Sequence, residues 1–219
     1  MAIVLIGQQG CGKGTQARLL AEKYKLKHIE VGNLLRQIAK EKNSLGKKVD
    51  QLINKEGKMI PRDLVIQVID RAISKATKNE GLILDGTTRR QVEIAPLEKI
   101  LSKYSYSISY IFYLKISKAI TISRLGKRRV CQQCGRSFIA GVDITLQQKK
   151  CSFCGGQIIR RIDDRPMAIR QRLAIYQTKT QPVIKYYQQQ KKLIEINGKQ
   201  PIKKVFRDIV QYLDDYYKK

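Results

Sequence analysis

The sequence predicts an α/β fold in which helices flank a parallel sheet, and two observations carry this prediction. A short, continuous run of apolar and mostly β-branched residues at 2–6 is typical of a buried strand, and similar runs follow at 81–86, around 110–116 and at 192–198. Segments with helical periodicity separate these runs. Strands that alternate with helices are typical of a parallel sheet with helices on both of its faces.

Helical patterns are predicted in four segments between and after these strands. They lie at 14–25, 31–41, 64–76 and 202–217. In the second of them, Leu34, Leu35 and Ile38 fall on one face of the helix. An insert at about 126–165 breaks the alternation, because it carries paired cysteines and several glycines but little helical periodicity.

The chain of 219 residues carries a formal net charge of +26, with 44 Lys and Arg against 18 Asp and Glu. Such a charge favours a phosphate-rich partner, either a nucleotide or a nucleic acid. The lysines are scattered along the whole chain, which favours a basic compositional habit as the origin of most of them. No apolar run has membrane-spanning length, and the first residues lack the basic region of a signal peptide. We therefore expect a cytoplasmic protein with no membrane partner.

The segment GQQGCGKGT at 7–15 follows the first predicted strand and opens the first predicted helix, which is the context of a phosphate-binding loop. Glycines let backbone N–H groups point at phosphate oxygens, and the helix N-terminus adds the positive end of its dipole. Lys13 is expected to reach the β and γ phosphates, with the Thr15 hydroxyl near the metal-bound phosphate edge. The alternative is a tight glycine turn without a ligand. The predicted ATP-binding residues of this loop are Gly10, Cys11, Gly12, Lys13, Gly14 and Thr15.

Four cysteines form two Cys-x-x-Cys pairs with sixteen residues between them, and a glycine follows each pair. This is the spacing of a structural zinc site with four thiolate ligands. An insert of about forty residues with few apolar side chains cannot build its own core, so a metal crosslink would let it fold. Disulfides are the alternative, which a cytoplasmic location disfavours. The predicted zinc ligands are Cys131, Cys134, Cys151 and Cys154.

Several segments in this order resemble the nucleoside monophosphate kinases, and the adenylate kinase family in particular, over nearly the whole chain. They are GKGTQA at 12–17, VGNLLR at 31–36, EGKMIP at 56–61, LDGTTRR at 84–90, RLGKRRVCQQCG at 124–135, RRIDDRP at 160–166 and RQRLAIY at 170–176. The resemblance implies a P-loop core at 1–29, 62–125 and 166–219, a nucleoside-monophosphate-binding excursion at 30–61 and a zinc lid at 126–165. It implies a monomeric enzyme that moves a phosphoryl group from ATP, with Mg²⁺, to a nucleoside monophosphate, with AMP as the first choice of acceptor.

The resemblance also implies roles for arginines, whose planar fork grips phosphate and does not deprotonate. Arg36 and Arg89 would hold the acceptor phosphate, and Arg124 would stack on the donor base. Residues Arg128, Arg161 and Arg172 would close on the transferring and donor phosphates. Asp85 would hold Mg²⁺ through water. The implied acceptor-site residues are Val31, Gly32, Arg36, Met59, Gly86, Arg89 and Glu93. For each arginine the alternative is a solvated surface cation.

Two neighbouring acids, Asp163 and Asp164, follow Arg161 directly in the sequence. The resemblance assigns them to the hinge and lid near the donor site. A pair for general acid–base catalysis is a competing interpretation, but transfer to a phosphate needs no strong base. A solvated turn is a further alternative.

The chain departs from the family pattern mainly around the acceptor, at Val31, Asn33, Thr87, Thr88 and Glu93. Glu93 stands where the family has a glutamine that reads adenine, and an ionised carboxylate offers only acceptors. We therefore expect relaxed discrimination between bases, unless the chain is shifted here so that Gln91 takes the place of the glutamine.

Two other function classes remain open. One is a nucleotide-binding protein without turnover, against which the retained Lys13 and arginines argue. The other is a basic zinc-ribbon protein that binds nucleic acid. Basic residues do not concentrate near the cysteines and few aromatic residues lie there, so nucleic acid is not an expected partner.

Overall fold

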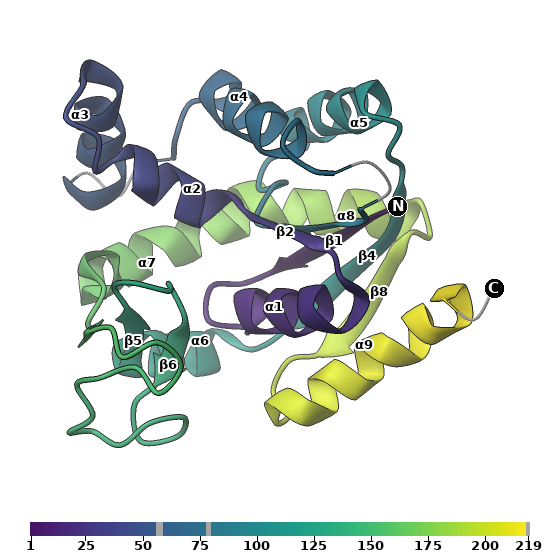
Figure 1. Cartoon of the computed structure of the whole chain (residues 1–219). Helices are drawn as coiled ribbons and strands as arrows, with labels where there is room; N and C mark the ends of the chain where they lie inside the picture. Colours follow the sequence, from purple (N-terminus) through teal and green to yellow (C-terminus); the bar gives the residue numbers. More distant parts are fainter. Residues whose placement is uncertain (56–58, 78–79, 218–219) are drawn as a thin grey trace.

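The computed structural model describes residues 1–55, 59–77 and 80–217 (Figure 1). Its centre is a five-stranded, all-parallel sheet in the order β2-β3-β1-β4-β8. The strands are β1 (Ala2–Gly7), β2 (Lys27–Glu30), β3 (Leu82–Asp85), β4 (Ile108–Lys115) and β8 (Leu193–Asn197). The predicted fold class, a parallel sheet with flanking helices, is confirmed.

Helices cover both faces of this sheet, and the side chains between the helices and each face form one hydrophobic cluster. The nine α-helices of the described chain are α1 (Lys13–Tyr24), α2 (Val31–Ile38), α3 (Ser44–Asp50), α4 (Arg62–Ile73), α5 (Ile94–Lys103), α6 (Lys118–Lys127), α7 (Pro166–Ile175), α8 (Gln181–Gln189) and α9 (Ile202–Tyr217). Alternate residues of β1 separate the two faces: Ile3 and Leu5 pack with α1 and α9, whereas Val4 and Ile6 pack with α2, α4, α5 and α8. This alternation follows from the two-residue period of a strand.

Short helical segments join several of these elements. They are the π-helical turns η1 (Gln51–Lys55) and η4 (Tyr176–Thr180) and the 3₁₀ turns η2 (Gln91–Glu93) and η3 (Ile162–Asp164). The predicted acceptor segment at 56–61 is described only from Met59 onward, because residues 56–58 lie outside the described residues.

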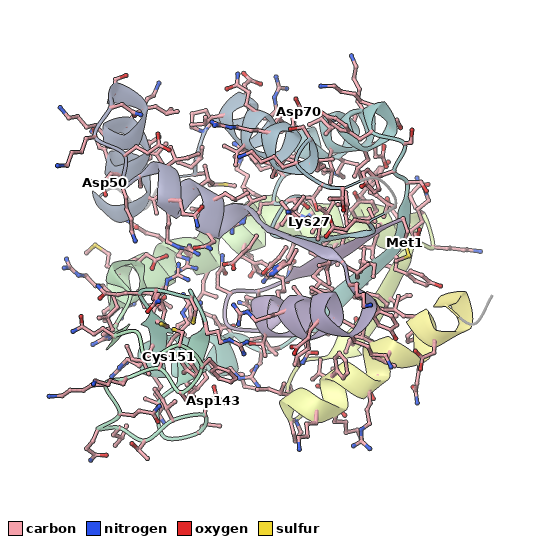
Figure 2. The ribbon with its side chains drawn as sticks, in the orientation of Figure 1. Met1, Lys27, Asp50, Asp70, Asp143 and Cys151 are labelled. Carbon is pink, nitrogen blue, oxygen red and sulfur yellow. The ribbon has the colours of Figure 1, made fainter. Side chains whose placement is uncertain are left out.

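Two excursions project from the sheet on the side away from the N-terminus (Figure 2). Asp50, at the end of α3, lies on one of them, and Cys151 and Asp143 lie on the other. The second excursion contains a small antiparallel sheet in the order β6-β5-β7, made of β5 (Arg128–Cys131), β6 (Ser137–Ile139) and β7 (Ile158–Ile159). Its own core is one small cluster that includes Phe138, Ile144 and Ile158. The carboxyl ends of the parallel strands point between the two excursions, which is where ligands bind in open α/β sheets.

Candidate active site

The glycine-rich loop joins the end of β1 to α1 in a conformation that depends on its glycines. Gly10 and Gly12 have φ angles of +79° and +98°, in the left-handed region that favours glycine. A Cβ at Gly7 would lie 2.6 Å from the carbonyl oxygen of Leu114 and 2.7 Å from Sγ of Cys11. Cys11 itself is buried. The loop therefore packs tightly against β4 and leads directly into the N-terminus of α1.

Lys13, at the start of α1, folds back over the loop. Its Nζ donates to the carbonyl oxygens of Gly7 at 2.7 Å and Gln8 at 3.1 Å. On the other side of the loop, Nη1 of Arg124 on α6 donates to the carbonyl oxygens of Gly10 at 3.2 Å and Gly198 at 3.1 Å. Two cationic side chains thus flank the loop. Thr15 lies half-buried in the first turn of α1.

Two carboxylates lie beside the loop, at the ends of neighbouring strands. Glu30 ends β2 and Asp85 ends β3, and the two are paired in the sheet register. Oδ2 of Asp85 lies 3.3 Å from the position that a Cβ on Gly14 would occupy. Burial raises the pKa of Asp85 above its ordinary value, while the nearby charge of Lys13 lowers it. A second cation beside Asp85 would stabilise its charged form.

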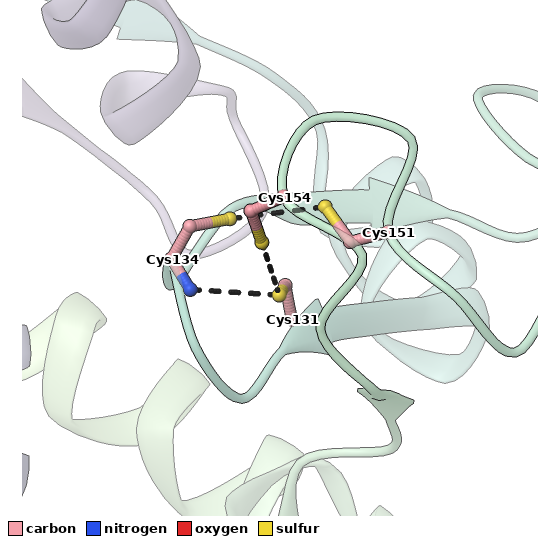
Figure 3. Close-up of side chains that lie close together, drawn as sticks. All are labelled: Cys131, Cys134, Cys151 and Cys154. Atoms are coloured by element: carbon pink, nitrogen blue, oxygen red, sulfur yellow. Dashed lines mark hydrogen bonds between the residues drawn. The ribbon is translucent and has the colours of Figure 1, made fainter.

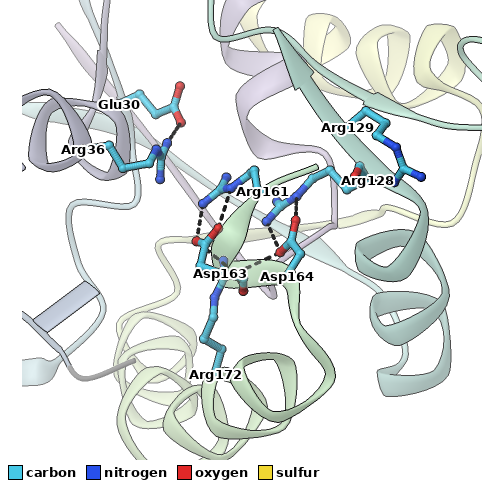
Figure 4. Close-up of polar contacts among 8 residues, drawn as sticks. All are labelled: Glu30, Arg36, Arg128, Arg129, Arg161, Asp163, Asp164 and Arg172. Carbon is cyan, nitrogen blue, oxygen red and sulfur yellow. Dashed lines mark hydrogen bonds and ion pairs between the residues drawn. The ribbon is translucent and has the colours of Figure 1, made fainter. Parts of the chain in front are cut away.

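An arginine cluster lies at the base of the second excursion, where the chain leaves and rejoins the core (Figure 4). Arg128 donates two hydrogen bonds to the carboxylate of Asp164, from Nε to Oδ2 at 2.7 Å and from Nη2 to Oδ1 at 2.6 Å. Both side chains are buried. Arg161 pairs with Asp163 in the same two-pronged manner. Nη1 of Arg172 donates to both acids, at 3.3 Å to Asp163 and 3.2 Å to Asp164. The two acids are committed to arginines, so the general acid–base interpretation has no support in this geometry.

The electrostatics of this cluster are those of an anion site. Burial, together with neighbouring guanidinium groups, lowers the pKa of Arg36 to about 10. Burial is also the main cause that lowers the pKa of Arg172 to about 9. For Asp163 burial acts in the opposite sense, but the charge of Arg161 outweighs it and holds the pKa below its ordinary value. The positively charged guanidinium groups repel one another, and a bound anion would offset that repulsion.

A cavity runs from this cluster toward α2 and α4. Four arginines of its lining lie near one another: Arg36, Arg89, Arg161 and Arg172. Its other walls are mostly apolar and are formed by Val31, Leu35, Ile53, Met59, Ile60 and Val65. Gly32 and Gly86 complete it beside the arginines, where a Cβ on either glycine would approach a guanidinium group. A cavity lined by clustered arginines and by apolar side chains can hold a molecule that carries both a phosphate and a flat, largely apolar group.

Glu93 also lines this cavity, but its carboxylate is not free. Oε2 accepts from the backbone N–H groups of Arg89 at 2.8 Å and Arg90 at 3.1 Å, and Oε1 accepts from Nε of Arg90 at 2.7 Å. Gln91, the alternative reader of the base, is exposed and is not among the residues that line the cavity. Glu93 therefore positions Arg90 and does not present open acceptors to a ligand.

The four cysteines of the paired motifs meet in the second excursion (Figure 3). Their Sγ atoms all lie within 4.8 Å of one another. Four thiolates about 2.3 Å from one zinc ion would lie roughly 3.8 Å apart, and the Sγ atoms of Cys134 and Cys151 are 3.8 Å apart. Gly135 and Gly155 each follow a Cys-x-x-Cys pair with φ near +70°, and the N–H of each bonds the carbonyl oxygen of the first cysteine in its pair. The donor set and its spacing fit a tetrahedral zinc site.

The predicted site residues fall into three groups in the structure. The acceptor-site residues, with Arg161 and Arg172, line one cavity; the loop residues lie between β1 and the first turn of α1, with Asp85 and Arg124 beside them; and the cysteines form their own cluster. Arg128 is not among the residues that line the cavity. Sequence reasoning missed Glu30, which accepts from Arg36 at 3.1 Å, and Arg90. The spacing of Arg90 and Glu93, three residues apart, was the signal for that pair.

Comparisons with known proteins give the same family name over nearly the whole chain. A family model described as "Adenylate kinase" matches residues 5–192. Curated proteins named adenylate kinase are similar over nearly the full length of both chains. One from Thermosipho melanesiensis is 33% identical over 97% of this chain and 99% of its own. Others from Geobacillus sp. and Lachnospira eligens are 34% and 35% identical over 97% of this chain and cover 98% and 100% of their own.

Proposed function

The chain belongs to the adenylate kinase family, which carries out phosphotransfer between ATP and a nucleoside monophosphate, and on that premise we propose that its acceptor is AMP. One observation supports the proposal above the others. The cavity beside the glycine loop is lined by the neighbouring arginines Arg36, Arg89, Arg161 and Arg172 and elsewhere by mostly apolar side chains. That combination suits the phosphate and the base of a nucleoside monophosphate. The names of the relatives favour adenine as its base.

On the donor side, we propose that the loop and Lys13 bind the phosphates of ATP. The loop glycines let backbone N–H groups face phosphate oxygens, and α1 adds its N-terminal dipole. Nζ of Lys13 now bonds carbonyl oxygens of its own loop. A triphosphate offers this ammonium a full charge in place of two dipoles, so Lys13 would turn toward it.

On the acceptor side, Arg36 and Arg89 would bind the monophosphate, while Arg161 and Arg172 face it from the base of the second excursion. Phosphoryl transfer needs two polyanions brought into line, their charge neutralised and water kept out. Preorganised guanidinium groups supply that neutralisation without reorganising during the reaction. We propose that the phosphates displace Asp163 as the partner of Arg161 and Arg172.

Two metals belong to this proposal. Phosphoryl transfer from ATP uses Mg²⁺ on the nucleotide phosphates, and Asp85, a buried carboxylate beside the loop, is the residue that would hold the hydrated ion. Zinc at the four cysteines would tie the turn between β5 and β6 to the segment that precedes β7 in the second excursion, which has few apolar residues of its own. In this proposal Mg²⁺ would neutralise phosphate charge and zinc would support the structure.

The test is a comparison of kcat/KM for AMP, GMP, UMP and CMP with Mg²⁺ and ATP. We expect AMP to be converted to ADP with a turnover number on the order of 1–100 s⁻¹, the range typical of kinases. Conversion of UMP or CMP without conversion of AMP would contradict the choice of acceptor and leave the phosphotransfer intact. Arg71, an exposed residue of α4 that does not line the cavity, provides a matched control. Arg36→Met should raise KM for the monophosphate, and Arg71→Met should leave it unchanged.

A further inference from the structure

An ion pair on the cavity wall has no role in the proposed transfer of the phosphoryl group. Arg90 and Glu93 both line the cavity together with the apolar residues Met59, Ile60 and Val65. Nη2 of Arg90 and Oε1 of Glu93 are 2.6 Å apart, and the exposed fractions of the two side chains are 19% and 2%. A charged pair in this apolar part of the wall is where the base of a bound nucleotide would be read.

Glu93 has no open position for a ligand. Oε2 accepts two backbone N–H groups, and Oε1 is shared by two nitrogens of Arg90. A carboxylate oxygen has about two lone-pair sites, so both oxygens are filled. An amino group on a base therefore finds no acceptor at Glu93.

Arg90 is held in one orientation but keeps one donor group available. Its Nε bonds Oε1 of Glu93, and its Nη2 donates to the carbonyl oxygen of Ile60 at 3.1 Å. Its Nη1 has no hydrogen-bond partner within residues 1–55, 59–77 and 80–217. Because these two hydrogen bonds and the ion pair between Nη2 and Oε1 of Glu93 fix the guanidinium plane, the two hydrogens of Nη1 lose little conformational freedom when they bind a ligand.

The bases differ in what they offer to such a donor. Adenine carries an amino group at position 6, which is a donor, whereas hypoxanthine and guanine carry a carbonyl oxygen there, which accepts. A guanidinium group contacts a carbonyl oxygen well and an amino group badly, because donor would face donor. Inosine monophosphate (IMP) has the same ring size, sugar and phosphate as AMP. A comparison of the two therefore tests the edge of the base that carries position 6 and the adjoining N1.

We propose that Arg90, held in place by Glu93, is a specificity-determining residue that reads an exocyclic oxygen, so that 6-oxopurine nucleoside monophosphates are acceptors alongside AMP. This inference rests on the proposed function, since it concerns the base of the same acceptor. Glu93 acts through Arg90 and is a positioning residue. The expected discrimination between AMP and 6-oxopurine nucleoside monophosphates is accordingly weak.

The experiment measures kcat/KM for AMP, IMP and purine ribonucleoside 5′-monophosphate, which has only hydrogen at position 6. Transfer from ATP labelled in its γ-phosphate to each acceptor is followed by chromatography of the labelled diphosphates, which avoids coupling enzymes with their own preferences. We expect the value for IMP to be at least one tenth of that for AMP and at least fivefold above that for the unsubstituted purine. A value for IMP below one tenth of that for AMP, or below fivefold over the unsubstituted purine, overturns the proposal.

Two variants test whether the ratio of kcat/KM for IMP to that for AMP depends on Arg90. Arg90→Met removes the donors and keeps an unbranched side chain, and it should lower the IMP-to-AMP ratio at least fivefold. Arg71→Met, on the exposed face of α4, should leave the ratio unchanged. A smaller change in Arg90→Met, or an equal change in both variants, overturns the role of Arg90. If Arg90→Met does not fold, the wild-type ratios decide the matter alone.

The two proposals fail in different ways. Absence of transfer to every monophosphate would overturn the proposed function and this inference with it. Transfer to AMP with IMP below one tenth would overturn the inference and leave the proposed function standing.

Discussion

Replacement of Asp163 by asparagine should cost far more stability than the same replacement at an exposed ion pair. Asp163 accepts from Nε of Arg161 at 2.8 Å and from Nη1 of Arg172 at 3.3 Å, and its side chain is 13% exposed. Removal of one partner from a buried ion pair costs about 3–5 kcal/mol, because the remaining charge stays buried without compensation. For a chain of this size that loss lowers the Tm by roughly 6–20 °C.

The matched control is Asp63→Asn. Asp63 pairs with Arg62 on the surface, at 2.9 Å, with exposed fractions of 77% and 50%. An exposed pair contributes about 0.2–1 kcal/mol, because water and salt screen it. The expected decrease in Tm is therefore less than about 4 °C. Both variants change one carboxylate to an amide of the same shape, so the difference between them measures burial and the arginine environment.

The stabilisation by Asp163 should depend on pH in a definite direction. Burial raises the pKa of Asp163, but the charge of Arg161 outweighs it, so the folded-state pKa lies below the ordinary value of about 4. A group with a depressed folded pKa contributes stability that is fully present above its unfolded pKa and is lost as the pH falls toward its folded pKa. The difference in Tm between wild type and Asp163→Asn should be constant from pH 7 to pH 5 and shrink below about pH 4.

Thermal unfolding followed by circular dichroism checks both results. A decrease in Tm for Asp163→Asn as small as that for Asp63→Asn would refute the reasoning. A Tm difference between wild type and Asp163→Asn that grows as the pH falls would also refute it. Either result would mean that Arg161 and Arg172 are satisfied by other partners.

Two further predictions concern the donor loop and the cysteines. Lys13→Met should lower kcat by about 10²–10³, the loss typical of one preorganised donor, with an unchanged Tm, because Lys13 bonds its own loop and does not pack in the core. Activity within about threefold of wild type in the folded variant would contradict the role of Lys13. Elemental analysis should find one zinc per chain, and a chelator should destabilise the segment that holds Cys131, Cys134, Cys151 and Cys154 before the parallel sheet unfolds. Protein purified under reducing conditions with no metal and four reactive thiols would refute the site.

The local motifs were the most predictable part of this molecule. The phosphate loop and the paired cysteines are each defined within a few residues, and both depend on backbone conformations that only glycine adopts easily, as at Gly12 and Gly135. The four predicted strands also exist: β1, β3 and β4 carry apolar runs that the parallel sheet buries, and β8, at one edge, carries an apolar run of which only Ile196 is buried. The zinc ion and the roles of the arginines stay predictions.

Edge elements and side-chain partners were less predictable. Strand β2, at an edge of the sheet, was not predicted because Ile29 is the only apolar residue in its four, so it has no apolar run to recognise. Glu93 was expected to face a base with open acceptors. Its spacing to Arg90 was visible in the sequence, but the bonds that fill both of its oxygens include backbone N–H groups. Their direction depends on the turn η2, which no residue pattern specifies.

The central claim is that the phosphoryl group passes directly from one nucleotide at the loop to another in the adjoining cavity. The most direct measurement follows ATP labelled in its γ-phosphate in the presence and absence of AMP. Label should appear in the β-phosphate of ADP only when AMP is present, and inorganic phosphate should stay at background. Label released as inorganic phosphate at a rate independent of AMP would contradict direct transfer.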